Sequence, residues 1–170
     1  LGFNCEIMDL GNNKANLIAT LGTGPGGLVL AGHTDTVPCD ESLWQSDPFQ
    51  LSERDNRWYG LGSCDMKGFF PLAIEAVKTL KVRALKQPLI IVATADEESS
   101  MSGAKALVAA GKPIARRAVI GEPTNMRPVK MHKGIMIEKL TISGSSGHSS
   151  NPALGKNAME SMQRIIGQLM

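Results

Sequence analysis

Residues 27–35 read GLVLAGHTD, a continuous apolar run that leads directly into glycine, histidine and aspartate. Two later segments repeat this pattern, LIIVATADEE at 89–98 and RAVIGEP at 117–123. Continuous apolar runs of this length are typical of strands that are buried on both faces of a sheet. Each segment therefore predicts a buried strand with polar or acidic side chains at its end.

The regions around these runs predict further strands and helices. Residues 67–81 carry apolar side chains at helical spacing, and 103–110 is a short alanine-rich helix candidate. A strand pair at 4–8 and 16–21 precedes the first run. Strands that alternate with helices predict an α/β fold with a mixed, largely parallel sheet flanked by helices.

The pattern changes after Pro128. Residues 135–142 alternate apolar and polar side chains, which predicts a half-exposed strand, and Asn151-Pro152 introduces a helix that continues to the end of the chain. We expect a first domain at 1–130 and the start of a second at 131–170. Because the chain starts without Met and stops inside a helical pattern, we also expect it to be an excerpt from a longer polypeptide.

Composition excludes several classes of partner. The 18 basic and 16 acidic residues are scattered and give a formal net charge of +2, which predicts no nucleic-acid partner. The apolar runs are much shorter than the roughly 20 residues of a membrane span, so no membrane partner is predicted. The three cysteines contain no CxxC pair and predict neither a disulfide framework nor a thiolate zinc site. A reducing cytoplasm fits this cysteine usage best.

Six side chains beside glycines or at predicted strand ends are candidates for a metal site: His33, Asp35, Asp65, Glu97, Glu98 and Glu122. Ligands of α/β sheets bind outside the carboxyl ends of the strands. One imidazole and several carboxylates suit Zn²⁺, Mn²⁺ or Co²⁺, and two such ions about 3.5–4 Å apart can share a carboxylate.

Each candidate taken alone also has a purely structural reading. The histidine would be a hydrogen-bonded strand end, Asp65 and Glu122 helix caps or turn residues, and Glu97 and Glu98 the acidic first turn of a helix. Their joint occurrence favours the metal site, because unpaired carboxylates gathered at one edge would repel one another without a cation.

Spacing predicts how the site is organised. Asp35 lies two residues after His33, so its carboxylate is expected to accept a hydrogen bond from one ring nitrogen while the other nitrogen binds metal. At a strand-to-turn junction, one of Glu97 and Glu98 is expected to bind metal while its neighbour faces the attacking water as general base.

Four blocks together resemble the co-catalytic zinc aminoacylase and carboxypeptidase family: GHTDTVP at 32–38, YGLGSCDMKG at 59–68, TADEE at 94–98 and IGEPT at 120–124. They occur in the order of the family and span most of the chain. The resemblance implies a partial zinc-peptidase-like catalytic domain at 1–130 and the beginning of an α+β lid and dimerisation domain at 131–170.

The resemblance also implies a role for each side chain. His33 and Glu122 would bind one zinc ion, Glu98 would bind a second, and Asp65 would bridge the two. Glu97 would be the general base, taking a proton from water and passing it to the leaving amine. A cis peptide bond is expected between Asp65 and Met66.

Two further roles follow from the same resemblance. Asp35 would orient His33, and His148 of one subunit would polarise the scissile carbonyl in the active site of its partner within a homodimer. His132 is left as a structural residue. The family's second zinc takes another histidine, which no residue after His148 supplies, so we expect fewer than two zinc ions per chain and little turnover from the excerpt alone.

Within the family, the blocks are most similar to the acetylornithine deacetylase and succinyl-diaminopimelate desuccinylase group. This implies hydrolysis of an N-acyl amino acid, with N-acetyl-L-ornithine of arginine biosynthesis as the first choice. The alternative is a succinyl-diaminopimelate desuccinylase, or another N-acyl-amino-acid hydrolase or metallopeptidase of the same family. Zinc is the expected metal, for which cobalt or manganese would substitute. The non-enzyme alternative is a protein that binds metal without hydrolysis.

Overall fold

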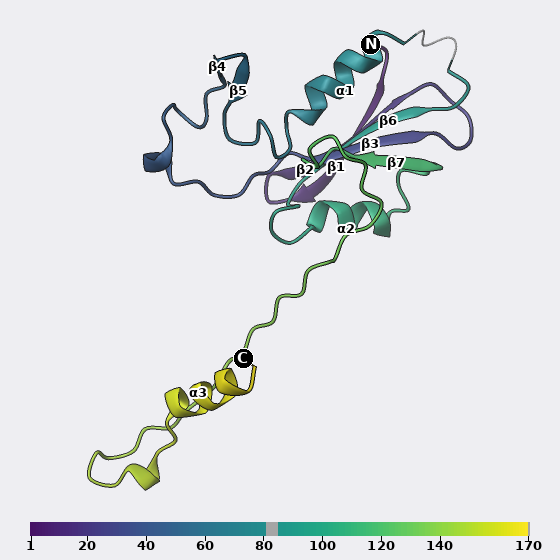
Figure 1. Cartoon of the computed structure of the whole chain (residues 1–170). Helices are drawn as coiled ribbons and strands as arrows, with labels where there is room; N and C mark the ends of the chain where they lie inside the picture. The colour runs from purple at the N-terminus through teal and green to yellow at the C-terminus, as the bar shows by residue number, and fades with distance from the viewer. Residues whose placement is uncertain (81–84, 170) are drawn as a thin grey trace. The chain divides into compact units, whose positions relative to one another are not determined.

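The computed structural model describes residues 1–80 and 85–169 of the chain. The chain divides into two units, Leu1–Pro128 and Val129–Met170, each of which packs mainly against itself (Figure 1). The assignment of 1–130 to a catalytic domain and of 131–170 to a lid domain stays a prediction.

A five-stranded mixed sheet forms the first unit. Its strands are β1 (Asn4–Gly11), β2 (Lys14–Leu21), β3 (Leu28–His33), β6 (Leu89–Thr94) and β7 (Arg117–Ile120), in the order β1-β2-β6-β3-β7. The pairs β1/β2 and β2/β6 are antiparallel, whereas β6/β3 and β3/β7 are parallel. The five strands predicted for this unit are therefore confirmed, and the strands with polar ends form the parallel part of the sheet.

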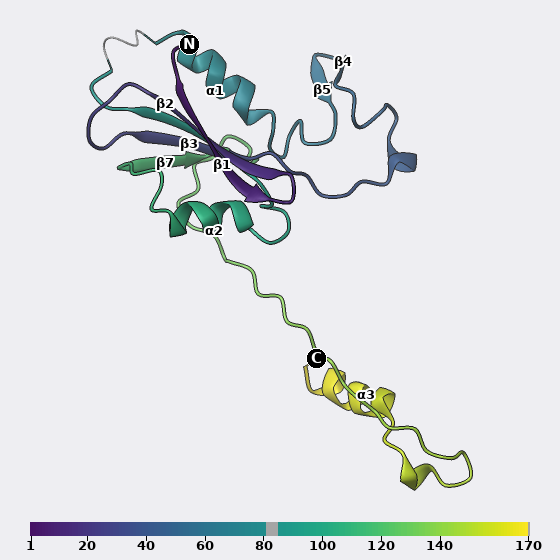
Figure 2. The same cartoon turned by 180° about the vertical axis from the view of Figure 1, so that it is seen from behind.

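Two helices, α1 (Phe69–Lys78) and α2 (Ser102–Ala109), cover opposite faces of this sheet (Figures 1 and 2). Val29 packs in one apolar cluster with Leu107 of α2, while its neighbour Leu28 packs in another with Val77 of α1. Successive strand residues point to opposite faces, so a strand between two helices must be apolar at every position. This explains the uninterrupted apolar runs.

The helices are close to their predicted positions. The helix predicted at 67–81 spans Phe69–Lys78, and position 81 lies outside the described residues. The helix predicted at 103–110 spans Ser102–Ala109. Among the helices that the structure describes, none combines the length and apolar character that crossing a bilayer requires.

The long connection between β3 and α1 contains elements that the sequence analysis did not predict. A short 3-10 helix, η1 (Glu41–Leu43), is followed by the hairpin of β4 (Ser52–Arg54) and β5 (Arg57–Tyr59), a separate two-stranded sheet. Its turn residues Asp55 and Asn56 have φ values of 53° and 57°. Positive φ at both positions matches the twist of a two-residue hairpin, and Asp and Asn tolerate it.

The second unit corrects one prediction. The helix α3 (Ala158–Leu169) is confirmed, although a 3-10 turn, η3 (Pro152–Leu154), precedes it instead of one continuous helix, and position 170 lies outside the described residues. The strand predicted at 135–142 is wrong: the structure assigns none there, and Ile135 is 84% exposed. A strand needs a neighbour for its backbone hydrogen bonds, and the described part of this unit offers only an isolated bridge between Ser145 and Lys156.

Candidate metal centre at the strand ends

The parallel strands β6, β3 and β7 bring the predicted site residues to one edge of the sheet. His33 is the last residue of β3 and is paired in register with Thr94, the last residue of β6. On the other side, Ala31 pairs with Ile120 at the end of β7. The segments that follow β6 and β7 therefore deliver the predicted acids to either side of the central strand.

Burial and a hydrogen bond fix the ring of His33 in an orientation that suits a metal ligand. Its side chain is only 1% exposed, and Nδ1 lies 2.9 Å from the backbone carbonyl oxygen of Asp35. A carbonyl only accepts, so Nδ1 carries the proton and the neutral ring keeps a lone pair on Nε2. This Nε2 lies 3.4 Å from Asp65 Oδ1, 3.8 Å from Glu97 Oε2 and 4.0 Å from Glu122 Oε1.

Asp65 reaches this edge because the next residue anchors its loop. Met66 is completely buried, and its methyl group and the ring of Phe70 fill the space beside Gly32 of β3. The Asp65–Met66 peptide bond is cis, as expected. The loop that carries Asp65 is thus fastened to the end of the central strand.

Asp35 acts differently from the prediction. Its backbone carbonyl, not its carboxylate, accepts the hydrogen bond from His33, and the carboxylate stays 3.5 Å from Nδ1. The carboxylate instead accepts the backbone N–H groups of Glu97 (3.1 Å) and Glu98 (3.0 Å). Because β3 ends at His33, the side-chain alternation of a strand does not extend to position 35. Asp35 therefore joins β3 to the loop that carries both glutamates.

Two groups of side chains have the geometry to hold a metal ion. They are His33 with Glu97 and Glu122, and His33 with Asp65 and Glu98, and in each group the candidate ligand atoms lie within 4.8 Å of one another. All four predicted ligands are thus gathered at the site. Glu97 lies as close as the ligands do, so its role as general base stays a prediction.

The electrostatics of the cluster indicate an excess of negative charge. Burial, followed by the charge of Asp65, raises the pKa of Glu98, and the same two causes raise the pKa of Glu122. Burial is also the largest influence on His33 and disfavours its charged form, but the Asp35 carbonyl and the nearby carboxylates together raise the pKa of this histidine. One imidazole among several carboxylates is a donor set that divalent Zn²⁺, Co²⁺ and Mn²⁺ accept, and a cation would relieve the repulsion.

His148 belongs to the second unit, Val129–Met170, and its ring has a defined tautomer. Its Nδ1 accepts the N–H of Ser150 at 3.2 Å and lies 2.7 Å from the hydroxyl of the same residue. The proton of the neutral ring is therefore on Nε2, which lies on an exposed side chain and has no hydrogen-bond acceptor among the described residues. His132, read as structural, accepts the N–H of Gly134 at 3.0 Å.

Comparison with known proteins places this geometry in a family. Residues 29–169 match the family described as peptidase family M20/M25/M40. The chain belongs to this family. Two similar relatives are the acetylornithine deacetylases of Pasteurella multocida (strain Pm70), 52% identical, and Klebsiella pneumoniae (strain 342), 51% identical. Both matches cover 100% of this chain and 45% of the relative, so the chain spans about half the length of these proteins.

A solved structure supports the fold of this M20/M25/M40 chain. The M20-family metallo-carboxypeptidase from Sulfolobus solfataricus matches with a TM-score of 0.55 and 20% identity. The match covers 71% of this chain and 29% of the carboxypeptidase. The α/β architecture predicted from the apolar runs is therefore confirmed.

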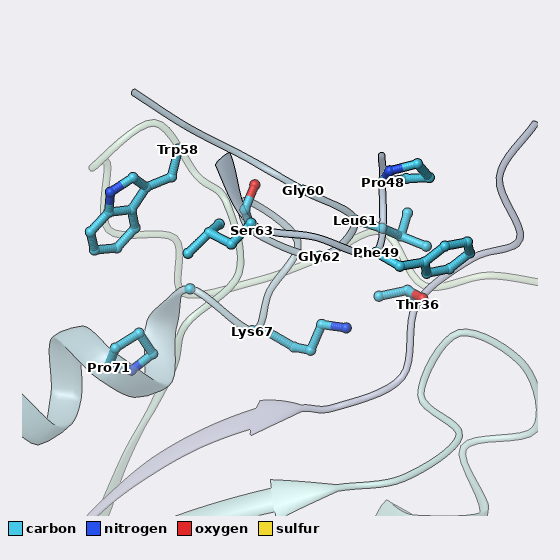
Figure 3. A pocket seen from close by; sticks show the side chains of 12 residues that line it. Thr36, Pro48, Phe49, Trp58, Gly60, Leu61, Gly62, Ser63, Lys67 and Pro71 are labelled. Carbon is cyan, nitrogen blue, oxygen red and sulfur yellow. The ribbon is translucent and has the colours of Figure 1, made fainter. Parts of the chain in front are cut away.

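The connection between β3 and α1 of this M20/M25/M40 chain forms a hollow of about 500 Å³ (Figure 3). Its lining includes Phe49, Trp58 and Lys67. A second hollow of about 500 Å³ shares Trp58 and extends to Asp65 and Glu98. The sequence analysis missed this space because the hairpin that carries Trp58 is too short to give a periodic pattern. The acids thus face a space large enough for a small molecule.

Proposed function

We propose that the full-length protein carrying this chain is a metal-dependent amidohydrolase that cleaves N-acetyl-L-ornithine into L-ornithine and acetate. The observation that carries the proposal is the buried Nε2 of His33 within 4.0 Å of three carboxylates at the ends of parallel strands. Identity of about half to acetylornithine deacetylases over the whole chain supports the choice of substrate. The reaction would belong to arginine biosynthesis in the cytoplasm.

The proposed metal ligands are His33, Asp65, Glu98 and Glu122, with two zinc ions per subunit of the full-length protein. The donor set supports zinc, with cobalt or manganese as substitutes. A divalent cation supplies Lewis acidity, which polarises a carbonyl oxygen and makes water a better nucleophile at neutral pH. Asp65 lies in one group with Glu98, and its Oδ1 is 3.4 Å from Nε2 of His33, so it would help to hold the metal.

Glu97 is the proposed general base. The backbone N–H of Glu97 donates to the Asp35 carboxylate, and the Glu97 side chain is 35% exposed. The backbone of Glu97 is therefore held in place while its carboxylate is accessible to an incoming water. It would accept a proton from the attacking water and deliver that proton to the leaving amine, a transfer that typically contributes about 10²- to 10⁴-fold to the rate.

His148 of the partner subunit is the proposed donor to the carbonyl oxygen of the substrate. Its free Nε2–H fits this role, because charge develops on that oxygen as the amide carbon becomes tetrahedral. This role requires a homodimer formed through the second unit. The substrate is proposed to bind in the hollow that borders Asp65 and Glu98, with the scissile amide beside the acids.

The test is an assay of the full-length protein against N-acetyl-L-ornithine and N-succinyl-diaminopimelate, with and without chelator. We expect chelator-sensitive release of ornithine that exceeds release of diaminopimelate. A Glu98→Gln variant should lose metal and activity, whereas Glu75→Gln, which changes an exposed glutamate on α1, should lose neither. Preference for the succinyl substrate would make the protein a desuccinylase, and metal binding without hydrolysis of either would refute an enzymatic role.

A further inference from the structure

A buried asparagine is hydrogen-bonded to both ends of the loop that carries Glu97 and Glu98. Asn16 on β2 is 1% exposed. Among the described residues, Asn16 and His33 are the only buried polar side chains. Its Oδ1 accepts the N–H of Ala95 at 3.1 Å, where the loop begins. Its Nδ2 donates to the carbonyl oxygen of Gly103 at 2.9 Å, where the loop rejoins a helix.

The chemistry of this contact requires an amide side chain. One partner is a donor and the other an acceptor, and asparagine offers both functions on neighbouring atoms. Both bonds are buried, so they are shielded from competition with bulk water. Loss of the asparagine would leave the buried N–H of Ala95 without this acceptor and would release the Gly103 carbonyl from its contact with β2. Loss of a buried hydrogen bond of this kind is more costly than loss of an exposed one.

The two ends of the loop, at Ala95 and Gly103, are packed so closely that position 103 has no room for a side chain. The N–H of Gly103 donates to the carbonyl oxygen of Ala95 at 3.2 Å. A Cβ at Gly103 would meet that carbonyl oxygen and lie 2.5 Å from Oδ1 of Asn16. The two ends of the loop are thus brought together around one amide group.

Surface contacts of the same strand add to this closure. Lys14, two residues before Asn16, binds the carboxylate of Asp96 at 2.7 Å, and the Ser102 hydroxyl donates to the same carboxylate at 2.7 Å. On the opposite side, Asp35 holds the N–H groups of Glu97 and Glu98. The loop is therefore held by β2 near its two ends and, through Asp35, by the segment that follows β3.

We infer that Asn16 is a positioning residue that sets where Glu97 and Glu98 stand relative to His33. The inference rests on the proposed function for the meaning of those positions. Asn16 itself belongs to neither group of candidate metal ligands. It acts through the loop: without its two bonds, the segment between Ala95 and Gly103 gains freedom, and the carboxylates no longer meet the imidazole at a fixed distance. Groups that support metal ligands in this indirect way typically change metal affinity about 10- to 100-fold.

The experiment compares Asn16→Ala with Ile18→Val in the full-length protein. Ile18 lies on the same strand, is 5% exposed and packs in the core with Val29 and Ile90, so its variant loosens the core without changing a bond to the loop. The probe is Co²⁺ added to the metal-free protein, followed by calorimetric titration and by its visible absorption spectrum. Amide hydrogen exchange at Glu97 and Glu98 is measured in parallel.

We expect Asn16→Ala to weaken Co²⁺ binding about 10- to 100-fold, to alter the cobalt spectrum and to speed exchange at both amides, while Ile18→Val matches wild type. Wild-type cobalt affinity and spectrum in a folded Asn16→Ala protein would overturn the inference. If that variant does not fold, exchange in the wild type decides: the Ala95 amide must be among the slow ones, and fast exchange there overturns the inference.

The outcomes also separate this inference from the proposed function. A wild-type protein that binds cobalt but hydrolyses no N-acyl amino acid would end the functional proposal, while the affinity and exchange comparison would still decide the role of Asn16. Conversely, activity on N-acetyl-L-ornithine with no effect of Asn16→Ala would end the inference alone.

Discussion

Replacing Asp35 with asparagine tests how the acidic loop is tied to the central strand. The carboxylate accepts two backbone N–H groups, from Glu97 at 3.1 Å and Glu98 at 3.0 Å. Asparagine keeps one oxygen and presents an NH₂ group in place of the other. One of the two backbone donors therefore loses its acceptor and faces a second donor.

The size of the effect follows from these contacts. A hydrogen bond to a charged group contributes about 1.5–3 kcal/mol, and because the Asp35 side chain is 25% exposed, water recovers part of it, leaving a loss of about 1–2 kcal/mol. Without metal, the removal of one negative charge from a crowded cluster offsets some of that loss. With metal, both effects act in the same direction, because the cation loses an attractive charge and an ordered loop. Metal affinity should therefore fall more clearly than stability, by about 10- to 100-fold.

The assay is a calorimetric titration of the metal-free full-length protein with Zn²⁺, combined with urea unfolding in chelator. The matched control is Asp40→Asn, because Asp40 also accepts a backbone N–H, from Ser42 at 3.0 Å, but does so in an exposed turn outside both groups of candidate ligands. The control should bind zinc like the wild type. Undiminished zinc affinity in Asp35→Asn would refute the reasoning that this carboxylate organises the site.

Three more predictions concern the acids and His148. In the full-length protein, Glu97→Gln should lower kcat by at least about 100-fold while zinc content, measured by atomic absorption, is kept; loss of zinc would instead make Glu97 a ligand. The metal-free protein should be more stable towards urea at about pH 5.5 than at about pH 7.5, because the raised pKa values of Glu98, Glu122 and His33 make the folded state bind protons that the unfolded chain releases as pH rises. Saturating zinc should remove this trend, and a trend of the opposite sign would contradict the crowding of charge. His148→Ala should reduce kcat by about 10²- to 10³-fold without changing zinc content, and an unchanged kcat would exclude it as the carbonyl donor.

The sequence predicted what depends on local signals. Uninterrupted apolar runs identify strands that are covered on both faces, and polar residues at their ends must meet at one edge once the strands are parallel. For this reason the sequence alone predicts that His33, Glu98 and Glu122 lie together. Their gathering also needs β3 to lie between β6 and β7, which the order of the runs along the chain does not fix.

Contacts between residues that are far apart along the chain could not be predicted from local sequence patterns. The Asp35 carboxylate bonds to amides more than 60 residues away, and Asn16 bonds to Gly103 across 87 positions. Nothing in the local composition around Asn16 marks it as different from other polar residues in strands. The strand predicted at 135–142 failed for the opposite reason: alternation is a local signal, but a strand exists only if another segment supplies its hydrogen bonds.

Neighbouring strands in a sheet lie about 4.8 Å apart, so the ladder of β6, β3 and β7 fixes the backbone of His33. It also fixes Gly121, the residue before Glu122, whose N–H donates to the carbonyl of Ala31 at 3.0 Å. The bite of any chelate built on His33 and Glu122 is therefore a property of the sheet, which resists deformation. Asp65 and Glu98 stand on loops, so the positions of their carboxylates depend on the contacts that hold those loops and not on the ladder itself. Attempts to retune the centre for a different ionic radius should accordingly vary the loops and leave the strands untouched.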